Sequence, residues 1–123
     1  MNYAERLNQT KSNYPFKRWA ENAQFAPNVY SSENCDEITK IFDDLIADLI
    51  SKGEGASKSE NVESFRIAIE ATNKFNDKFN GCFIETGERE ELCELTDIIT
   101  VAAGLDPENY GEGEGLASEW REW

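Results

Sequence analysis

The side chains that could carry out chemistry in this 123-residue chain are carboxylates and thiols, because the sequence contains no histidine. Histidine is the usual general acid or base near neutral pH, so its absence removes the ordinary Ser-His and Cys-His nucleophiles. Carboxylates are paired at Asp43-Asp44 and at Glu90-Glu91. Adjacent residues of a helix point in different directions, so neither pair converges on one atom. We therefore predict that the chain is not an enzyme.

The sequence also offers little to a metal ion, a phosphate or a disulfide. The three cysteines, Cys35, Cys82 and Cys93, include no CxxC pair, which favours reduced thiols with structural roles. Residues 106–119 alternate oxygen ligands with glycine, but they lack the ligand spacing of a calcium-binding loop. The glycines at 111–115 alternate with glutamates, which would repel a phosphate. We expect no cofactor.

A large excess of negative charge limits which partners the chain can have. Twenty-five acidic residues and twelve basic ones give a net charge of -13. This charge repels nucleic acid and anionic lipid, so we expect no direct binding to either, and it favours a monomer before any partner binds.

The amino terminus has no apolar run typical of a signal peptide, and no stretch is long and apolar enough for a membrane helix. The sequence therefore predicts a cytoplasmic protein.

Hydrophobic periodicity predicts the elements that would position these side chains. Apolar residues recur at helical spacing over residues 33 to 52, 59 to 80 and 87 to 104, and shorter helical patterns precede them around Tyr3 to Lys11 and after Pro15. Pro27 interrupts the second short pattern. We predict one all-α domain, a compact antiparallel bundle of four or five helices. It comprises N-terminal helices (1–32), core helices (33–105) and an acidic aromatic tail (106–123).

Residue types at the segment ends predict where these helices begin and end. Ser31 or Ser32 can cap the first long helix and Thr86 the last one, while Gly53, Gly81 and Gly104 can end the three long helices. The short run at residues 82–84 could be an extended link or a buried turn. Residues 111–115 are predicted to be a flexible acidic linker that joins the last long helix to a segment with two tryptophans.

The negative charge is concentrated late in the chain, where twelve acidic and two basic residues lie between residues 82 and 123. Solubility alone could account for this surface. Its mixture with aromatic residues is also typical of an interface, in which carboxylates select a basic partner and aromatic rings anchor it. The candidate partner-binding residues are Asp43, Asp44, Asp48, Glu88, Glu90, Glu91, Glu94, Asp97, Tyr110, Glu112, Glu114, Glu119, Trp120 and Trp123.

The chain is small and acidic, lacks catalytic groups, and ends on the segment Gly104-Leu105-Asp106 through Ser118-Glu119-Trp120-Arg121-Glu122-Trp123. In these features it resembles bacterial toxin-immunity proteins of the polymorphic-toxin and contact-dependent growth inhibition type. The resemblance implies a cognate nuclease toxin as partner, with its basic substrate cleft covered by carboxylates. Two alternatives stay open: a phage-type inhibitor that mimics nucleic acid toward a host enzyme, and a helical adaptor that binds through its aromatic tail. If both tryptophans instead fold back onto the core, the interface moves to the helix carboxylates.

Overall fold

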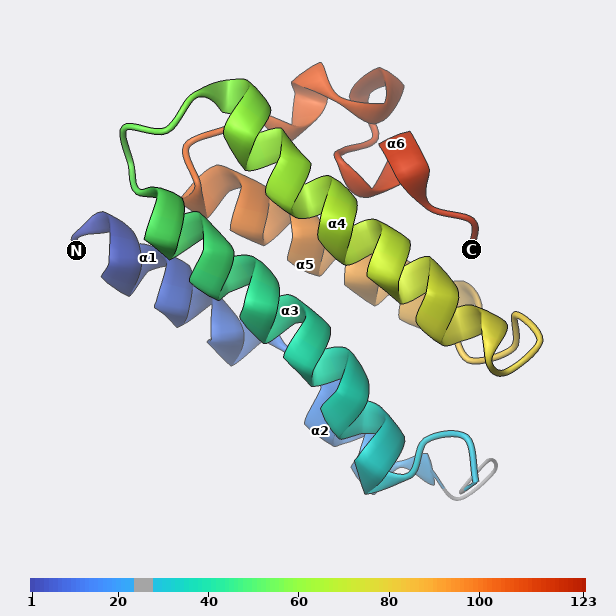
Figure 1. The fold of residues 1–123 in the computed structure, drawn as a ribbon. Helices are drawn as coiled ribbons and strands as arrows, with labels where there is room; N and C mark the ends of the chain where they lie inside the picture. The colour runs from blue at the N-terminus through green and yellow to red at the C-terminus, as the bar shows by residue number, and fades with distance from the viewer. Residues whose placement is uncertain (24–27) are drawn as a thin grey trace.

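Two layers of helices enclose one core in the computed structural model, which describes residues 1–23 and 28–123 (Figure 1). One layer is formed by the antiparallel helices α3 (Ser32–Lys52) and α4 (Lys58–Asp77). Behind it lie α1 (Tyr3–Gln9), α2 (Phe16–Glu21) and α5 (Thr86–Ala102), and the short α6 (Ala117–Trp120) packs on α4 and α5. Among the described residues there are also the 3-10 turns η1 (Thr10–Asn13), η3 (Pro107–Asn109) and η4 (Gly111–Gly113).

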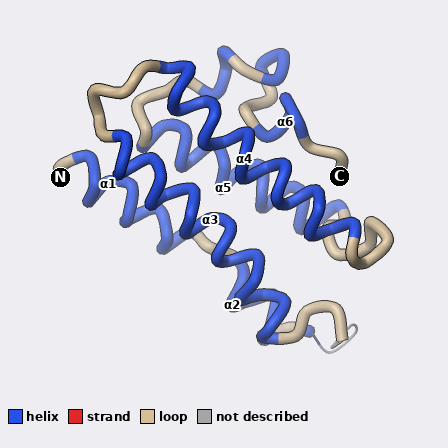
Figure 2. Tube along the Cα trace, viewed as in Figure 1, coloured by secondary structure: helices blue, strands red, loops and turns tan. Residues whose placement is uncertain are grey.

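Helices joined by loops and turns make up the described part of the chain, without a strand (Figure 2). This confirms the predicted all-α bundle. The short patterns near the amino terminus form α1 with η1, and then α2. The predicted break at Pro27 lies outside the described residues. No helix among those described is long and apolar enough to cross a membrane.

Local capping sets most helix ends where the sequence predicts them. The Ser31 hydroxyl accepts a hydrogen bond from the Asn34 N–H at 3.2 Å, and Gly53 ends α3 with a φ of 84°. The start of α5 differs from the prediction. Glu85, rather than Thr86, takes the cap position, because the Glu88 carboxylate accepts a hydrogen bond from the Glu85 N–H at 3.2 Å.

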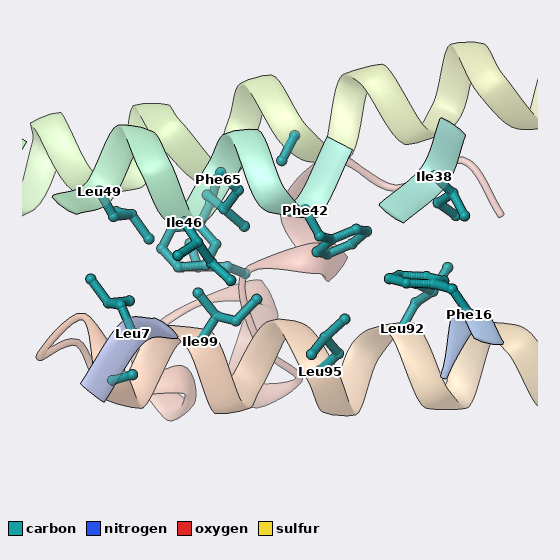
Figure 3. Packing of buried hydrophobic residues seen from close by; sticks show 14 of the residues in the cluster. Leu7, Phe16, Ile38, Phe42, Ile46, Leu49, Phe65, Leu92, Leu95 and Ile99 are labelled. Atoms are coloured by element: carbon teal, nitrogen blue, oxygen red, sulfur yellow. The ribbon is translucent and has the colours of Figure 1, made fainter. Parts of the chain in front are cut away.

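The core lies between α3 and α5, whose apolar side chains point toward each other (Figure 3). Leu7 of α1 and Phe16 of α2 complete it from the layer of α5. Truncating one such buried side chain to alanine typically costs about 2–5 kcal/mol. The α3 and α5 residues that fill this seam are Ile38, Phe42, Ile46, Leu49, Leu92, Leu95 and Ile99, each at most 1 % exposed.

A cluster of aromatic rings closes the end of the bundle where α4 leads into α5. Phe83 is completely buried and packs edge-on against Phe75 and Trp19, with ring centroids 4.7 and 6.1 Å away. Its carbonyl accepts a hydrogen bond from the Tyr30 hydroxyl at 2.8 Å. Ile84 is buried as well, whereas Cys82 is exposed, so the run at residues 82–84 is a non-helical link of which only the last two residues are buried.

The tail is part of the fold, and residues 111–115 are not the predicted flexible linker. The Tyr110 carbonyl accepts hydrogen bonds from the N–H groups of Gly113 and Gly115, each at 3.0 Å, so this segment closes into tight turns. The following residues Leu116 and Ala117 are buried. The side chain of Asn73 on α4 then holds the end of the chain. Its amide N–H donates a hydrogen bond to the Trp120 carbonyl, and its amide oxygen accepts one from the Glu122 N–H, each at 3.0 Å.

Gly111 tests how firmly this tail is docked. Its φ is 59°, and a Cβ added there would lie 2.8 Å from the Ser118 Cβ. Gly111→Ala should lower the free energy of unfolding in urea by about 1–3 kcal/mol through overpacking and backbone strain. Gly113→Ala is the control, because its φ is also positive while its Cβ would meet no atom within 4 Å. Equal losses for both variants would contradict a docked tail.

Candidate functional site

The three candidate carboxylates of α3 all have partners within the chain. Asp43 accepts a hydrogen bond from the Tyr14 hydroxyl at 2.9 Å. Asp44 pairs with Lys40 at 2.9 Å, one helical turn away. Asp48 lies 3.2 Å from the Lys52 ammonium and accepts a hydrogen bond from the Ser64 hydroxyl, and these contacts, the hydroxyl first, lower the pKa of Asp48.

The α3 and α5 carboxylates do not form one surface. Asp44 follows Phe42 by two residues, a rotation of about 200° around the helix axis, so it faces away from the core seam. Glu90 precedes Leu92 by the same interval on α5. Since Phe42 and Leu92 both point into the space between the two helices (Figure 3), the two acidic sides lie on opposite sides of the core.

Glu91 joins α2 to α5. Its two carboxylate oxygens accept hydrogen bonds from the Arg18 guanidinium at 3.2 and 2.5 Å, and one of them also accepts the Trp19 indole N–H at 3.0 Å. These hydrogen bonds raise the pKa of Arg18. Glu91 therefore has a structural role, as has Glu88 through its cap at the start of the helix.

Replacing Glu91 should destabilise the fold far more than replacing its neighbour. Glu91→Ala leaves the nearly buried Trp19 indole N–H without its acceptor, so we expect a loss of about 1–3 kcal/mol in urea unfolding. Glu90→Ala removes an exposed carboxylate that forms no hydrogen bond or ion pair with the described residues, and should stay within about 0.5 kcal/mol of the parent. Similar effects of the two substitutions would show that Glu91 is not a structural tie.

A second group of carboxylates, which we name the α5–tail surface, consists of Glu90, Glu94, Asp97, Glu112 and Glu114. The helix members lie three or four residues apart and so share one face. The tail crosses beside them, because Gly115 lies so close to Asp97 that any side chain there would overlap its carboxylate. Among the described residues, none of the five carboxylates forms an ion pair or a side-chain hydrogen bond; the ion pairs of the chain involve Glu37, Asp43, Asp44, Asp48, Glu54, Glu63, Glu70 and Glu91.

Asp97 is the member of this surface whose ionisation the fold disfavours. It is partly buried beneath the tail, and desolvation raises the pKa of Asp97. Burial also raises the pKa of the neighbouring Cys93 thiol; the Arg121 and Arg89 charges oppose this rise, and the Asp97 and Glu114 charges add to it. Among the described residues no cation pairs with Asp97, so its negative charge is not compensated within the chain.

Asp97→Asn should raise the melting temperature at pH 7. The raised pKa means that the folded state disfavours the carboxylate, so the ionised side chain lowers stability at every pH above that pKa. Below the ordinary Asp value of 3.8, the side chain is protonated in both states and the advantage of asparagine should disappear. Calorimetry at pH 3 and pH 7 measures the difference. A variant that is less stable at pH 7 would contradict this account.

The aromatic candidates of the tail face the protein rather than solvent. Tyr110, Trp120 and Trp123 are half-buried and pack against the core cluster. The Arg121 guanidinium lies 5.8 Å from the centroid of the Trp123 ring. Glu119 is exposed and accepts a hydrogen bond from the Gly111 N–H at 2.6 Å. The inward rings favour the helix carboxylates over the tryptophans as the interface.

Other kinds of site find little support in the described residues. Within residues 1–23 and 28–123, no three His, Cys, Asp or Glu side chains are placed to hold a metal ion. All three cysteines are free thiols, and burial raises the pKa of Cys35 to about 11. No protein-family model, curated protein or solved structure was found to match the chain.

Proposed function

We propose that this chain is a non-catalytic immunity protein that binds a cognate toxin domain, a nuclease, and neutralises it. The α5–tail surface would cover the basic cleft in which the nuclease holds its substrate. A groove built for a polyanion offers lysine and arginine side chains that carboxylates can satisfy with charge-assisted hydrogen bonds. The fourteen candidate residues are narrowed in this proposal to the five of the α5–tail surface and the neighbouring Glu119.

The observation that carries the proposal is the set of carboxylates that the chain leaves without an internal cation. Elsewhere in the described chain, eight carboxylates form ion pairs, as in the contacts of Arg66 with Glu63 and Glu70, while others such as Asp36 and Asp77 form none. The α5–tail surface differs in grouping, on one helix face and the tail, five carboxylates that have no ion pair among the described residues. Carboxylates on the α5–tail surface instead stay available to a cation from outside. Such a surface steers a basic partner during encounter and rejects an acidic one.

Two costs distinguish this surface from one that serves solubility alone. Glu90 and Glu94 lie four residues apart on α5, a spacing at which like charges destabilise a helix by about 0.2–0.5 kcal/mol. Asp97 adds the cost of keeping a desolvated carboxylate ionised. Solubility requires neither cost, since charges can be placed at greater distances from one another. A surface that keeps both of these destabilising features is expected where the binding of a partner offsets their cost in stability.

The two alternative functions differ in how the structure bears on them. A phage-type inhibitor of a host enzyme would use the same α5–tail surface, and only the partner distinguishes it from an immunity protein. An adaptor that binds through its aromatic tail would need Trp120 and Trp123 available. Because both rings pack against the core cluster, we favour the carboxylate surface.

The test uses the toxin domain encoded beside this chain's gene, assayed as a nuclease. Glu90→Lys combined with Glu94→Lys should weaken inhibition and raise the dissociation constant about 100-fold, because charge pairs in a desolvated interface become repulsive. Asp36→Lys combined with Asp77→Lys is the control, since it makes the same change in net charge at exposed carboxylates outside α5 and the tail. The control should keep its affinity within about threefold.

Three results would overturn the proposal. A neighbouring gene that encodes no toxin would remove the immunity function, and failure to inhibit a neighbouring toxin would do the same. Equal weakening by the test and control variants would mean that net charge, rather than the α5–tail surface, accounts for binding. Circular dichroism of both variants checks that the fold is kept.

A further inference from the structure

The face of α5 that carries the acidic residues continues into an exposed apolar side chain. Glu90, Glu94, Asp97 and Val101 follow one another at intervals of three or four residues, so they lie along one side of the helix. Among the described residues of α5, Val101 is the large apolar side chain that is mostly exposed, at 61 %. The helix therefore presents three carboxylates and then an aliphatic side chain to the same side.

Val101 lines a hollow at the place where α5 packs against α1 and η1. Ile98 and Ala102 of α5 line it as well, and residues of α1 and η1 form its other wall. The hollow has a volume of about 320 Å³. A side chain from another protein can therefore enter between Val101 and the wall.

The polar groups around this hollow are already bonded within the chain. Arg6 donates from Nε to the Ala102 carbonyl at 3.0 Å and from a terminal nitrogen to Glu54 at 3.3 Å. The Ser12 hydroxyl and the Asn13 amide donate to backbone carbonyls three residues earlier, at 2.9 and 3.4 Å. Because these donors are occupied, a polar group that entered the hollow would lose its contacts with water and gain few in return. The hollow therefore suits an apolar side chain.

An interface of ordinary size on the α5–tail surface must reach this hollow. Specific interfaces cover about 800 Å² per partner, which corresponds to a patch with a radius of about 16 Å. Val101 follows Glu94 by seven residues, a rise of about 10 Å along the helix. A patch centred on Glu94 includes Val101, so a partner that contacts the carboxylates also covers the hollow.

We propose that Ile98 and Val101 form the apolar anchor site of this interface and accept an aliphatic or aromatic side chain of the toxin domain. This inference rests on the proposed function and names a second part of the same contact. Carboxylates govern mainly the rate and selectivity of encounter, whereas most of the binding energy comes from a few well-packed, desolvated side chains. The tryptophans of the tail pack against the core and do not supply such a contact. The hollow supplies it beside the carboxylates.

Surface plasmon resonance on the immobilised toxin domain, in about 0.15 M and about 0.5 M salt, separates the anchor from the carboxylates. Val101→Ser should raise the dissociation rate constant about tenfold at both salt concentrations and leave the association rate constant within about twofold, because it removes apolar area without changing the charge. Glu90→Lys combined with Glu94→Lys should instead slow association, and more strongly at the lower salt concentration. Ile67→Ser is the matched control, since Ile67 is 55 % exposed on α4, outside α5 and the tail. It should bind like the parent.

The outcomes separate the anchor from the proposed function. If the parent binds the toxin domain but Val101→Ser dissociates at the parent's rate, the anchor is wrong and the function stands. Equal acceleration by Val101→Ser and Ile67→Ser, or slower association of Val101→Ser, would overturn the anchor in the same way. A toxin domain that the parent does not bind would overturn both. Urea unfolding of Val101→Ser should match the parent, because the side chain is exposed.

Discussion

The seam between α3 and α5 is the constraint on which the rest of the structure depends. The side chains of Phe42, Ile46 and Leu49 on one helix can be buried only if they face those of Leu95 and Ile99 on the other. Both helices are amphipathic, so this contact also fixes where their polar sides point. The acidic side of each helix must face outward, away from the other. One hydrophobic contact thus divides the acidic surface into two parts.

The unequal distribution of basic residues then gives the two parts different properties. Lys40 lies four residues before Asp44 and Lys52 four residues after Asp48, so both lysines pair with the α3 aspartates locally. From residue 82 onward the sequence contains only Arg89 and Arg121 as cations, and Arg121 lies over the Trp123 ring. The carboxylates of α5 and the tail therefore have few cations within reach. Their lack of partners follows from composition as much as from geometry.

The sequence predicts those features that depend on local spacing. Helical periodicity located α3, α4 and α5 to within a few residues, and the serine and glycine caps of α3 are set by neighbours in the chain. Contacts between distant segments could not be predicted in this way. Arg18 and Glu91 are 73 residues apart, and no pattern in either segment indicates the other. The hollow between α5 and α1 escaped prediction for the same reason, since it exists only once the two helices are packed.

The tail shows why a residue composition can mislead about order. Alternating glycine and glutamate suggests a flexible chain, because glycine has the largest conformational freedom and like charges repel. Here the glycines instead permit positive φ angles, such as 106° at Gly115, and the close approach to Asp97. The cost in conformational entropy is offset by the burial of Leu116 and Ala117 just beyond them.

A docked tail also changes what its glutamates can contribute to an interface. Charges on a flexible linker lose conformational freedom when a partner binds, and that loss subtracts from the binding free energy. Glu112 and Glu114 are held in the docked tail before any partner arrives, because the buried residues that follow them and Asn73 fix the tail in place. Packing of the tryptophans against the core thus removes them as anchors and preorganises the carboxylates beside them. In this way the inward rings strengthen the case for an acidic interface.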